Sequence, residues 1–481
     1  MEQHLPRYDV PLEQSGSYKQ ILEREDVPKD HGRDLKRPKA VRWGTLGVVL
    51  LLVIGAVVAT VVVLLGKNSS ASSSTVQGVV ASSPVVVASS SAISTTTTAP
   101  ITTTTRATTT TTRRVPTPST SPAVLPATGK FWFGIAVDNS TDVSVQQWTA
   151  GGTGVRPLLA HIYFYLQPYN FTTPVQLADY MISFFGGMSD NSVLMFTVQA
   201  VNGISEAEAP DSQIQALADA WRELNIRGYK ILVRVGHEMN GGWYPWGRIP
   251  TLFQEFWIRF TTIVRATAPI TSMVWSPTIS DSYPYDQRKI PAAGSPDMAF
   301  LDTNQNGELD GGDDPYSGYW PGDEWVDWVG GSIYYYGPSF PYNDNFVPDG
   351  HWLERTLTGR VTLTGEQRGP SFYDVYCVQK KKPFIYAETA VYHWPNGTGV
   401  DEVAQKQAFW RLALNRTTIA QFPMVRALAW FEVAKIEEAW ANQFLDFTIG
   451  NNPDVLQAFL GDVKAPGNTA ANIDTSIFVW G

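Results

Sequence analysis

Cysteine is almost missing from this chain of 481 residues, which contains Cys377 and no other. A single thiol cannot form a disulfide within the chain. Cys377 lies in the apolar, helix-like run 372–378, where a buried structural thiol is expected rather than a nucleophile. The second His of a zinc protease motif is also missing, because Gly241 stands four residues after His237. With no internal repeat either, the sequence argues against a disulfide framework, a zinc peptidase and a repeat protein.

Basic side chains are outnumbered, with 36 Lys and Arg against 45 Asp and Glu and a net charge of −9. The imbalance lies in residues 128–481, which carry 23 basic and 37 acidic side chains, whereas the first 127 residues carry 13 and 8. An acidic main part argues against nucleic acid as a partner. Its 354 residues are enough for one large barrel domain.

Residues 43–66 contain no charged side chain and consist mostly of Val, Leu and Ile. A helix of this length can cross a hydrocarbon core of about 30 Å. We therefore expect a transmembrane signal anchor; a cleaved signal peptide is the alternative, but the run is long and begins only after 42 residues. One basic residue, Lys67, follows the span closely, and six precede it: Lys29, Arg33, Lys36, Arg37, Lys39 and Arg42. The positive-inside rule then predicts a single-pass type II membrane protein, with a disordered cytosolic tail at 1–42 and the main domain extracellular or lumenal.

Residues 67–127 are dominated by Ser, Thr, Val, Ala and Pro. This composition cannot bury a core and is typical of an O-glycosylated stalk, with an unmodified flexible linker as the alternative. The chain also contains five sequons for N-glycosylation, at Asn68, Asn139, Asn170, Asn396 and Asn415. We therefore expect a glycoprotein whose main domain is held away from the bilayer.

The remaining residues, 128–481, alternate between apolar runs and helical patterns. Helical periodicity is found at 213–224, 252–267 and 402–414. Eight runs are candidate strands: 131–137, 158–166, 193–198, 229–235, 271–275, 328–334, 384–387 and 426–431. Strands that alternate with helices form parallel β/α units, and eight such units predict an α/β fold of the (β/α)8 TIM-barrel type.

A glutamate follows two of these runs. Glu238 follows the fourth run, within the segment 234–246, and Glu388 follows the seventh, within 383–389. Barrel enzymes place catalytic residues at the carboxyl ends of their strands. Retaining glycosidases use two carboxyl groups roughly 5 Å apart, one as acid/base and one as nucleophile. Trp243 and Trp246 suit this interpretation, because flat apolar rings pack against sugar faces; for Glu238 the alternative is a buried ion pair with Arg234.

These segments resemble glycoside hydrolase family 26, a β-mannanase-like, retaining family. Segment 234–246 is similar to its acid/base motif, Tyr-Ala-Glu-Thr at 386–389 to its nucleophile strand, and 321–334 to its sixth strand. The resemblance, which covers residues 128–481, implies Glu238 as acid/base and Glu388 as nucleophile. It further implies that Tyr334, or else Tyr335, hydrogen-bonds the nucleophile.

The same resemblance implies that His237 and Trp243 shape a sugar subsite. Gln199, preceded by Val198, stands where mannan-cleaving members commonly show Trp-His, and Ala390 stands where the family usually has Gly. Gln199 is nevertheless a candidate for substrate binding, as is Trp246. Trp430, in the eighth run, is either core or the wall of a subsite.

The function expected from this resemblance is internal cleavage of a β-linked polysaccharide without a catalytic cofactor. β-1,4-Mannan is the first candidate, and mixed-linkage β-1,3-1,4-glucan or another cell-wall β-glycan is the second. A carbohydrate-binding surface protein that has lost turnover is the alternative from another class. The presence of both acids argues against it.

A second motif lies before the sixth candidate strand. Oxygen-bearing side chains occupy the ligand positions of a 12-residue calcium loop of EF-hand type, with Gly307 at its sixth position. The alternative is a solvated acidic loop. The candidate ligands of a structural Ca²⁺ are Asp302, Asn304, Asn306, Glu308, Asp310 and Asp313.

Overall fold

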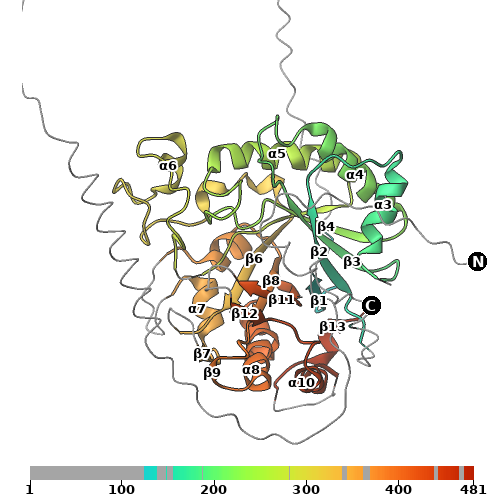
Figure 1. Ribbon diagram of the computed structural model, residues 1–481, viewed down its shortest axis with the longest axis vertical. Coiled ribbons are helices and arrows are strands. Elements are labelled where there is room, and N and C mark those ends of the chain that lie inside the picture. Colours follow the sequence, from blue (N-terminus) through green and yellow to red (C-terminus); the bar gives the residue numbers. More distant parts are fainter. Residues whose placement is uncertain are drawn as a thin grey trace, which may run out of the picture. The chain divides into compact units, whose positions relative to one another are not determined.

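The computed structural model describes residues 124–137, 148, 155–186, 188–280, 282–338, 344–360, 369–437, 443–464 and 471–480. In this part of the chain, strands and helices alternate around a central sheet (Figure 1). Eight parallel strands form that sheet: β1 (Phe131–Val137), β2 (Leu159–Tyr165), β3 (Val193–Gln199), β4 (Lys230–Val235), β5 (Ser272–Trp275), β6 (Trp328–Tyr335), β8 (Phe384–Val391) and β10 (Val425–Phe431).

The sheet closes on itself, because β10 pairs with β1. Ala427 lies opposite Trp132, and Phe431 lies opposite Ala136. Closure buries both faces of the strands, and β1 and β8 are buried along their whole length. Parallel strands covered on both faces are expected to be almost continuously apolar, which is how these segments read in the sequence.

Helices cover the outside of the barrel. Their bounds are α3 (Pro174–Ser183), α4 (Asp211–Ile226), α5 (Pro250–Thr267), α6 (Pro296–Leu301), α7 (Trp352–Thr358), α8 (Glu402–Leu414), α9 (Arg416–Gln421) and α10 (Pro453–Lys464). Short 3₁₀ turns lie at Ser317–Tyr319, Asp323–Trp325 and Thr475–Ile477, and a π-helical segment lies at Tyr373–Gln379.

Local sequence explains where these helices begin and which face they bury. The Asp401 carboxylate accepts the N–H of Ala404 at 2.8 Å and caps α8, and Pro174 lies in the first turn of α3. In α4, Ile214, Leu217, Ala218, Trp221 and Leu224 recur every three or four residues and are all buried. This spacing places one apolar stripe against the sheet.

Three short strand pairings lie outside the ring of eight strands. β7 (Asp344–Asn345) pairs with β9 (Thr398–Gly399), and β11 (Ala434–Glu437) pairs antiparallel with β12 (Gln443–Asp446) directly after β10. β13 (Phe478–Val479) pairs with the first residues of β1.

The chain enters the barrel at the amino ends of the strands. The Val124 N–H donates to the Ser272 hydroxyl at 2.8 Å, and the Trp328 indole donates to the Val124 carbonyl at 2.8 Å. Ser272 and Trp328 are the first residues of β5 and β6. Both ends of the described chain therefore lie at the face opposite to the carboxyl ends of the strands.

The predicted closed barrel of eight parallel strands is confirmed. All eight predicted runs overlap a strand, and α8 has the predicted bounds. The largest difference is β8, which continues through Glu388 and Thr389 to Val391, because polar side chains at a catalytic strand end do not interrupt the backbone pairing. Cys377 is buried as a free thiol, as predicted.

Several predictions concern residues outside the described ranges. These are the tail at 1–42, the transmembrane segment at 43–66, most of the stalk at 67–127, and the sequons at Asn68 and Asn139. Within the described ranges, none of the helices has the length and apolar character that a membrane span requires. Asn170 and Asn396 are exposed, whereas the Asn415 amide donates to the carbonyls of Arg411 and Leu412 and caps α9.

Candidate active site

Glu238 lies in a strained turn at the carboxyl end of β4. Gly236 has φ 57° and Glu238 itself has φ 54°, in the left-handed region that non-glycine residues occupy at a cost of about 1–3 kcal/mol. The Glu238 N–H donates to the Ser276 carbonyl at 2.9 Å, which ties the turn to the chain after β5. The Trp243 indole donates to the Glu238 carboxylate at 2.7 Å. The turn thus holds a half-buried carboxyl group at the mouth of the barrel.

Glu388 lies within β8 and has two strong partners. The Arg234 guanidinium contacts Oε2 at 2.8 Å, and the Tyr334 hydroxyl donates to Oε1 at 2.5 Å. Tyr335, the alternative to Tyr334, instead donates to the Val347 carbonyl at 3.0 Å. Both oxygens of Glu388 therefore receive a hydrogen bond, one of them from a charged group.

Arg234 is fully buried and fixed by neighbouring hydroxyl groups. Its Nε donates to Ser276 at 2.9 Å, and its Nη2 donates to Ser332 at 2.5 Å. Its ion pair is with Glu388, not with Glu238 as in the alternative derived from the sequence. A buried guanidinium held in this way has one orientation, so it presents a fixed positive charge to Glu388.

The two carboxyl groups have opposite electrostatic environments. Burial, followed by the charge of Glu388, raises the pKa of Glu238. Burial also acts to raise the pKa of Glu388, but the Arg234 charge and the Tyr334 hydrogen bond outweigh it, and the pKa is lowered to about 2. At neutral pH, Glu388 is therefore ionised, and Glu238 keeps its proton to a higher pH than an ordinary glutamate does. A general acid needs a raised pKa and a nucleophile needs a lowered one, and Glu238 and Glu388 differ in this way.

His237 adjoins Glu238 and is almost completely buried, 1% exposed. Its ring lies 4.6 Å from that of Tyr244 and 6.1 Å from that of Tyr163, between ring centroids. Among the described residues, neither ring nitrogen has a hydrogen-bond partner. Burial, then the Arg234 charge, lowers the pKa of His237 well below its usual value, so the ring is neutral.

Two residues on β2 were missed in the sequence. His161 contacts the Thr197 hydroxyl at 2.6 Å, and its ring centroid lies 4.8 Å from that of Tyr163. Burial, then the charge of Glu388, raises the pKa of Tyr163 well above its usual value. The available signal was the alternation of polar residues along β2, at His161, Tyr163 and Tyr165, which marks one face of the strand.

The predicted stacking residues divide into two groups. Trp243 is half-buried, and Gln199 is half-buried at the end of β3, so both remain near the mouth. Trp246 and Trp430 have no exposed surface, and their indoles donate to the carbonyls of His237 at 2.7 Å and Phe447 at 2.8 Å. A ring without an exposed face cannot stack on a sugar, so the stacking expected for Trp246 does not fit, and of the two alternatives for Trp430 the structure shows the core position. They support the loops instead.

The candidate calcium loop lies between α6 and β6. Asp302 accepts the N–H groups of Asn306 at 3.0 Å and Gly307 at 2.8 Å, and Asp310 accepts the side-chain amides of Asn304 and Asn306. Asp313, 2% exposed, accepts the N–H of Asp310, and Glu308 is exposed. Among the described residues, no group of three or more His, Cys, Asp or Glu side chains is arranged to hold a metal ion. The loop therefore has the predicted oxygen-rich side chains, but its carboxylates are occupied by amide donors.

A protein-family model matches part of the chain. Residues 196–349 match the model named Glycosyl hydrolase family 26. The chain therefore contains a glycosyl hydrolase family 26 segment. The predicted resemblance to this family is confirmed over residues 196–349, as is the predicted enzyme class, an O-glycosyl hydrolase, whereas the predicted membrane-anchored form is not shown. This family 26 segment includes Gln199, Glu238 and Tyr334, whereas Glu388 lies beyond it.

Solved structures with a similar fold include two mannanases. A Cellulomonas fimi endo-β-1,4-mannanase is 15% identical with a TM-score of 0.43, and the match covers 73% of this chain and 72% of that one. The Bacillus subtilis mannanase BCman is 14% identical with a TM-score of 0.35, over 63% of this chain and 80% of that one. No curated protein matches the chain. At such low identity and TM-score, neither structure carries an argument about the substrate of the family 26 segment.

Proposed function

We propose that the protein is a retaining endo-acting glycoside hydrolase that cleaves a β-linked polysaccharide by double displacement. The observation that carries this proposal is the unequal pair at the barrel mouth. Glu388 is held ionised by Arg234 and Tyr334, and the half-buried Glu238 has a raised pKa that is due in part to the charge of Glu388. Retaining hydrolysis requires one carboxylate and one carboxylic acid that face the same glycosidic bond.

In the first step, a Glu388 oxygen attacks the anomeric carbon, and Glu238 gives its proton to the leaving glycosidic oxygen. The bond between the anomeric carbon and that oxygen breaks, and a glycosyl ester on Glu388 forms. In the second step, Glu238 takes a proton from water, whose oxygen attacks the anomeric carbon and releases Glu388 as a carboxylate. Trp243 is placed to steady Glu238 in both protonation states, since its N–H donates to the carboxyl group.

The proposed substrate is β-1,4-mannan, by resemblance to the family, with mixed-linkage β-1,3-1,4-glucan or another cell-wall β-glycan as the alternative. Gln199 is proposed to bind sugar hydroxyl groups. His237 is proposed to shape the sugar subsite from beneath, because its buried ring packs against Tyr244 and Tyr163.

The test is product analysis with the purified full-length chain against mannan, mixed-linkage glucan, xylan and β-1,3-glucan. We expect one polymer to be shortened internally with retention of anomeric configuration, and we expect Glu238→Ala and Glu388→Ala to abolish cleavage. Inversion, or activity that survives in Glu388→Ala, would refute the mechanism. A folded chain that binds a polymer without cleaving it would indicate the carbohydrate-binding alternative.

We also propose the type II membrane topology and the structural Ca²⁺. The topology rests on the uncharged segment 43–66 and the basic residues before it. Alkaline carbonate extraction of membranes from expressing cells tests the membrane anchor. The chain should stay in the membrane pellet, and a variant lacking 43–66 should be released. Recovery of the intact full-length chain in the supernatant would disprove the anchor.

A further inference from the structure

Tyr334 is held from behind by two phenylalanine rings. The centroid of Phe447 lies 5.6 Å from that of Tyr334 with the planes at 71°, and that of Phe431 lies 5.6 Å away with the planes at 88°. Phe431 and Phe447 also pack on each other at 5.4 Å. Edge-to-face contacts of this kind fix the orientation of a ring. Since the Tyr334 hydroxyl donates to Glu388 at 2.5 Å, these rings lie directly behind the nucleophile's partner.

The backbone of Phe447 is itself fixed on both sides. Its N–H donates to the Val433 carbonyl at 3.1 Å, and its carbonyl accepts the Trp430 indole at 2.8 Å. Phe447 is 2% exposed. The buried Trp430 therefore holds the loop that carries Phe447.

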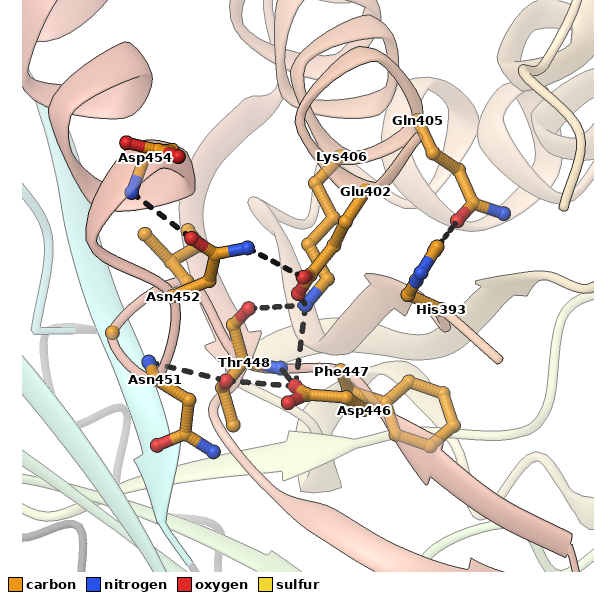
Figure 2. Close-up of polar contacts among 12 residues, drawn as sticks. His393, Glu402, Gln405, Lys406, Asp446, Phe447, Thr448, Asn451, Asn452 and Asp454 are labelled. Carbon is orange, nitrogen blue, oxygen red and sulfur yellow. Dashed lines mark hydrogen bonds and ion pairs between the residues drawn. The ribbon is translucent and has the colours of Figure 1, made fainter. Parts of the chain in front are cut away.

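A buried ammonium group holds the residues on either side of Phe447. Lys406, on α8, has no exposed surface, and its Nζ contacts Glu402 at 2.5 Å, Asp446 at 3.2 Å and the Thr448 carbonyl at 2.5 Å (Figure 2). Asp446 also accepts the N–H and the hydroxyl of Thr448, both at 2.7 Å. Because Lys406 is fully buried and its two carboxylate partners are only partly exposed, the cost of desolvation offsets much of their attraction, and the cluster acts mainly to fix geometry.

A second buried carboxylate holds the end of the same loop. Glu432 follows β10, has no exposed surface, and accepts the N–H groups of Ile449 at 2.9 Å and Gly450 at 2.5 Å. Residues 446–450 are thus held by Lys406 from α8 and by Glu432 from the end of the eighth barrel strand. Neither of these groups contacts Glu238 or Glu388.

We infer that residues 446–450, which we term the Phe447 clamp, hold the Tyr334 hydroxyl on Glu388, so that Phe447 is a positioning residue for the nucleophile. This inference rests on the proposed function. The clamp acts through Tyr334: if Phe447 is trimmed, the Tyr334 ring gains freedom, and its hydroxyl spends less time on the carboxylate. The charged cluster around Lys406 supplies the rigidity.

A double-mutant cycle in the full-length chain tests this route. Tyr334→Phe should lower kcat roughly ten- to a hundredfold, because a hydrogen bond to a charged group is lost. Phe447→Leu should lower kcat about three- to tenfold with little change in KM. In the Tyr334→Phe background, Phe447→Leu should have almost no further effect, because the contact through which it acts is gone. Fully multiplicative losses would overturn the inference.

The pH dependence gives a second readout that a merely structural role would not move. The groups that face Glu388 are Arg234, Glu238, His161, His237, Tyr163 and Tyr334. Of these groups, Tyr334 is the one against which Phe447 of the clamp packs. Both Tyr334→Phe and Phe447→Leu should therefore move the acidic limb of kcat/KM to higher pH and leave the basic limb in place. An unmoved acidic limb in Phe447→Leu contradicts the inference.

Phe459→Leu is the matched control, since Phe459 is equally buried but packs on Phe133, Trp148 and Trp410. It should lower the melting temperature as Phe447→Leu does, without moving the pH profile. An NMR titration of carboxyl groups, with Glu388 assigned from a Glu388→Gln spectrum, distinguishes failure of the proposed function from failure of the Phe447 clamp. If the chain cleaves no glycan but Phe447→Leu raises the pKa of Glu388, the proposed function fails and the clamp stands. If the pKa is unchanged, the clamp fails.

Discussion

At the scale of single residues, the two carboxyl groups differ in the donors that reach them. Glu388 receives a guanidinium and a phenol, whereas the donors to Glu238 are neutral, the Ser332 hydroxyl and the Trp243 indole N–H. A hydrogen bond from a charged, buried donor stabilises a carboxylate more than one from a neutral donor. The assignment of roles therefore follows from Arg234, which pairs with Glu388.

Trp243→Phe should move the basic limb of the pH profile to higher pH. The indole N–H stabilises the ionised form of Glu238 and so lowers its pKa; without this donor the acid keeps its proton to higher pH. The measurement is kcat/KM against pH. Trp246→Phe is the matched control, because that indole donates to a backbone carbonyl, and it should lower the melting temperature without moving the limb. Equal shifts in both variants would show that the indole bond to Glu238 is unimportant.

Arg234→Met should raise the pKa of Glu388 and move the acidic limb to higher pH, with a large loss of kcat. It should also lower the free energy of unfolding by about 3–5 kcal/mol near neutral pH, since a buried carboxylate is left without its partner. Denaturant unfolding measures the second effect. Arg234→Lys should recover part of both losses, because it restores the charge without the guanidinium fork. A Met variant as stable as the parent would contradict this account.

At the scale of elements, the loop after β12 connects stability to pH. Burial raises the pKa of Glu432 to about 7, above its ordinary value of 4.5, despite the N–H groups of Ile449 and Gly450. A raised carboxyl pKa means that its contribution to stability is fully present below about pH 4.5 and is lost as the pH rises through about 7.

Glu432→Gln should remove this dependence. The difference in unfolding free energy between the parent and Glu432→Gln should shrink between pH 5 and pH 8, by up to about 3 kcal/mol. Denaturant unfolding across this range gives the answer. Two parallel stability profiles would show that Glu432 does not titrate in that window.

The oxygen-rich loop before β6 offers a separate test. If it binds Ca²⁺, saturating Ca²⁺ should raise the melting temperature by a few degrees over an EDTA-treated sample, since a ligand at a hundred times its Kd stabilises by about 2.7 kcal/mol. Asp302→Ala should abolish the rise. Asp314→Ala should keep it, because Asp314 lies outside the six predicted ligand positions and accepts N–H groups of Tyr316 and Ser317. The same melting temperature with Ca²⁺ and with EDTA would refute the site.

Elements were predicted better than contacts. The strands were visible because both faces of each are buried, and the two acids because each follows an apolar run. The partners of Glu388 were not visible, because closure of the barrel alone decides that Arg234 on β4 meets β8, 154 residues away. For the same reason, the burial of Trp246 and Trp430 could not be read from their residue type. The hairpin of β11 and β12 carries too few apolar residues to give a periodic signal.

At the scale of the whole molecule, both ends of the described chain meet at one face. Val124 contacts the amino ends of β5 and β6, and Phe478 pairs with Phe131 at the start of β1. Glu238 and Glu388 belong to the opposite, carboxyl end of the barrel.

Immobilisation through the N-terminus should therefore leave the active site open. The full-length chain coupled to a bead by an N-terminal tag should keep the same ratio of activity on polymer to activity on a short oligosaccharide as the free chain. Reducing-end release from both substrates measures this ratio. Selective loss of polymer cleavage on the bead would show that the attachment point obstructs access of the polymer to Glu238 and Glu388.

The same arrangement has a consequence for the proposed cleavage of an insoluble glycan by an anchored enzyme. The described chain enters the barrel at the face opposite to Glu238 and Glu388, so a polymer that reaches these residues does not have to pass the point at which the chain enters.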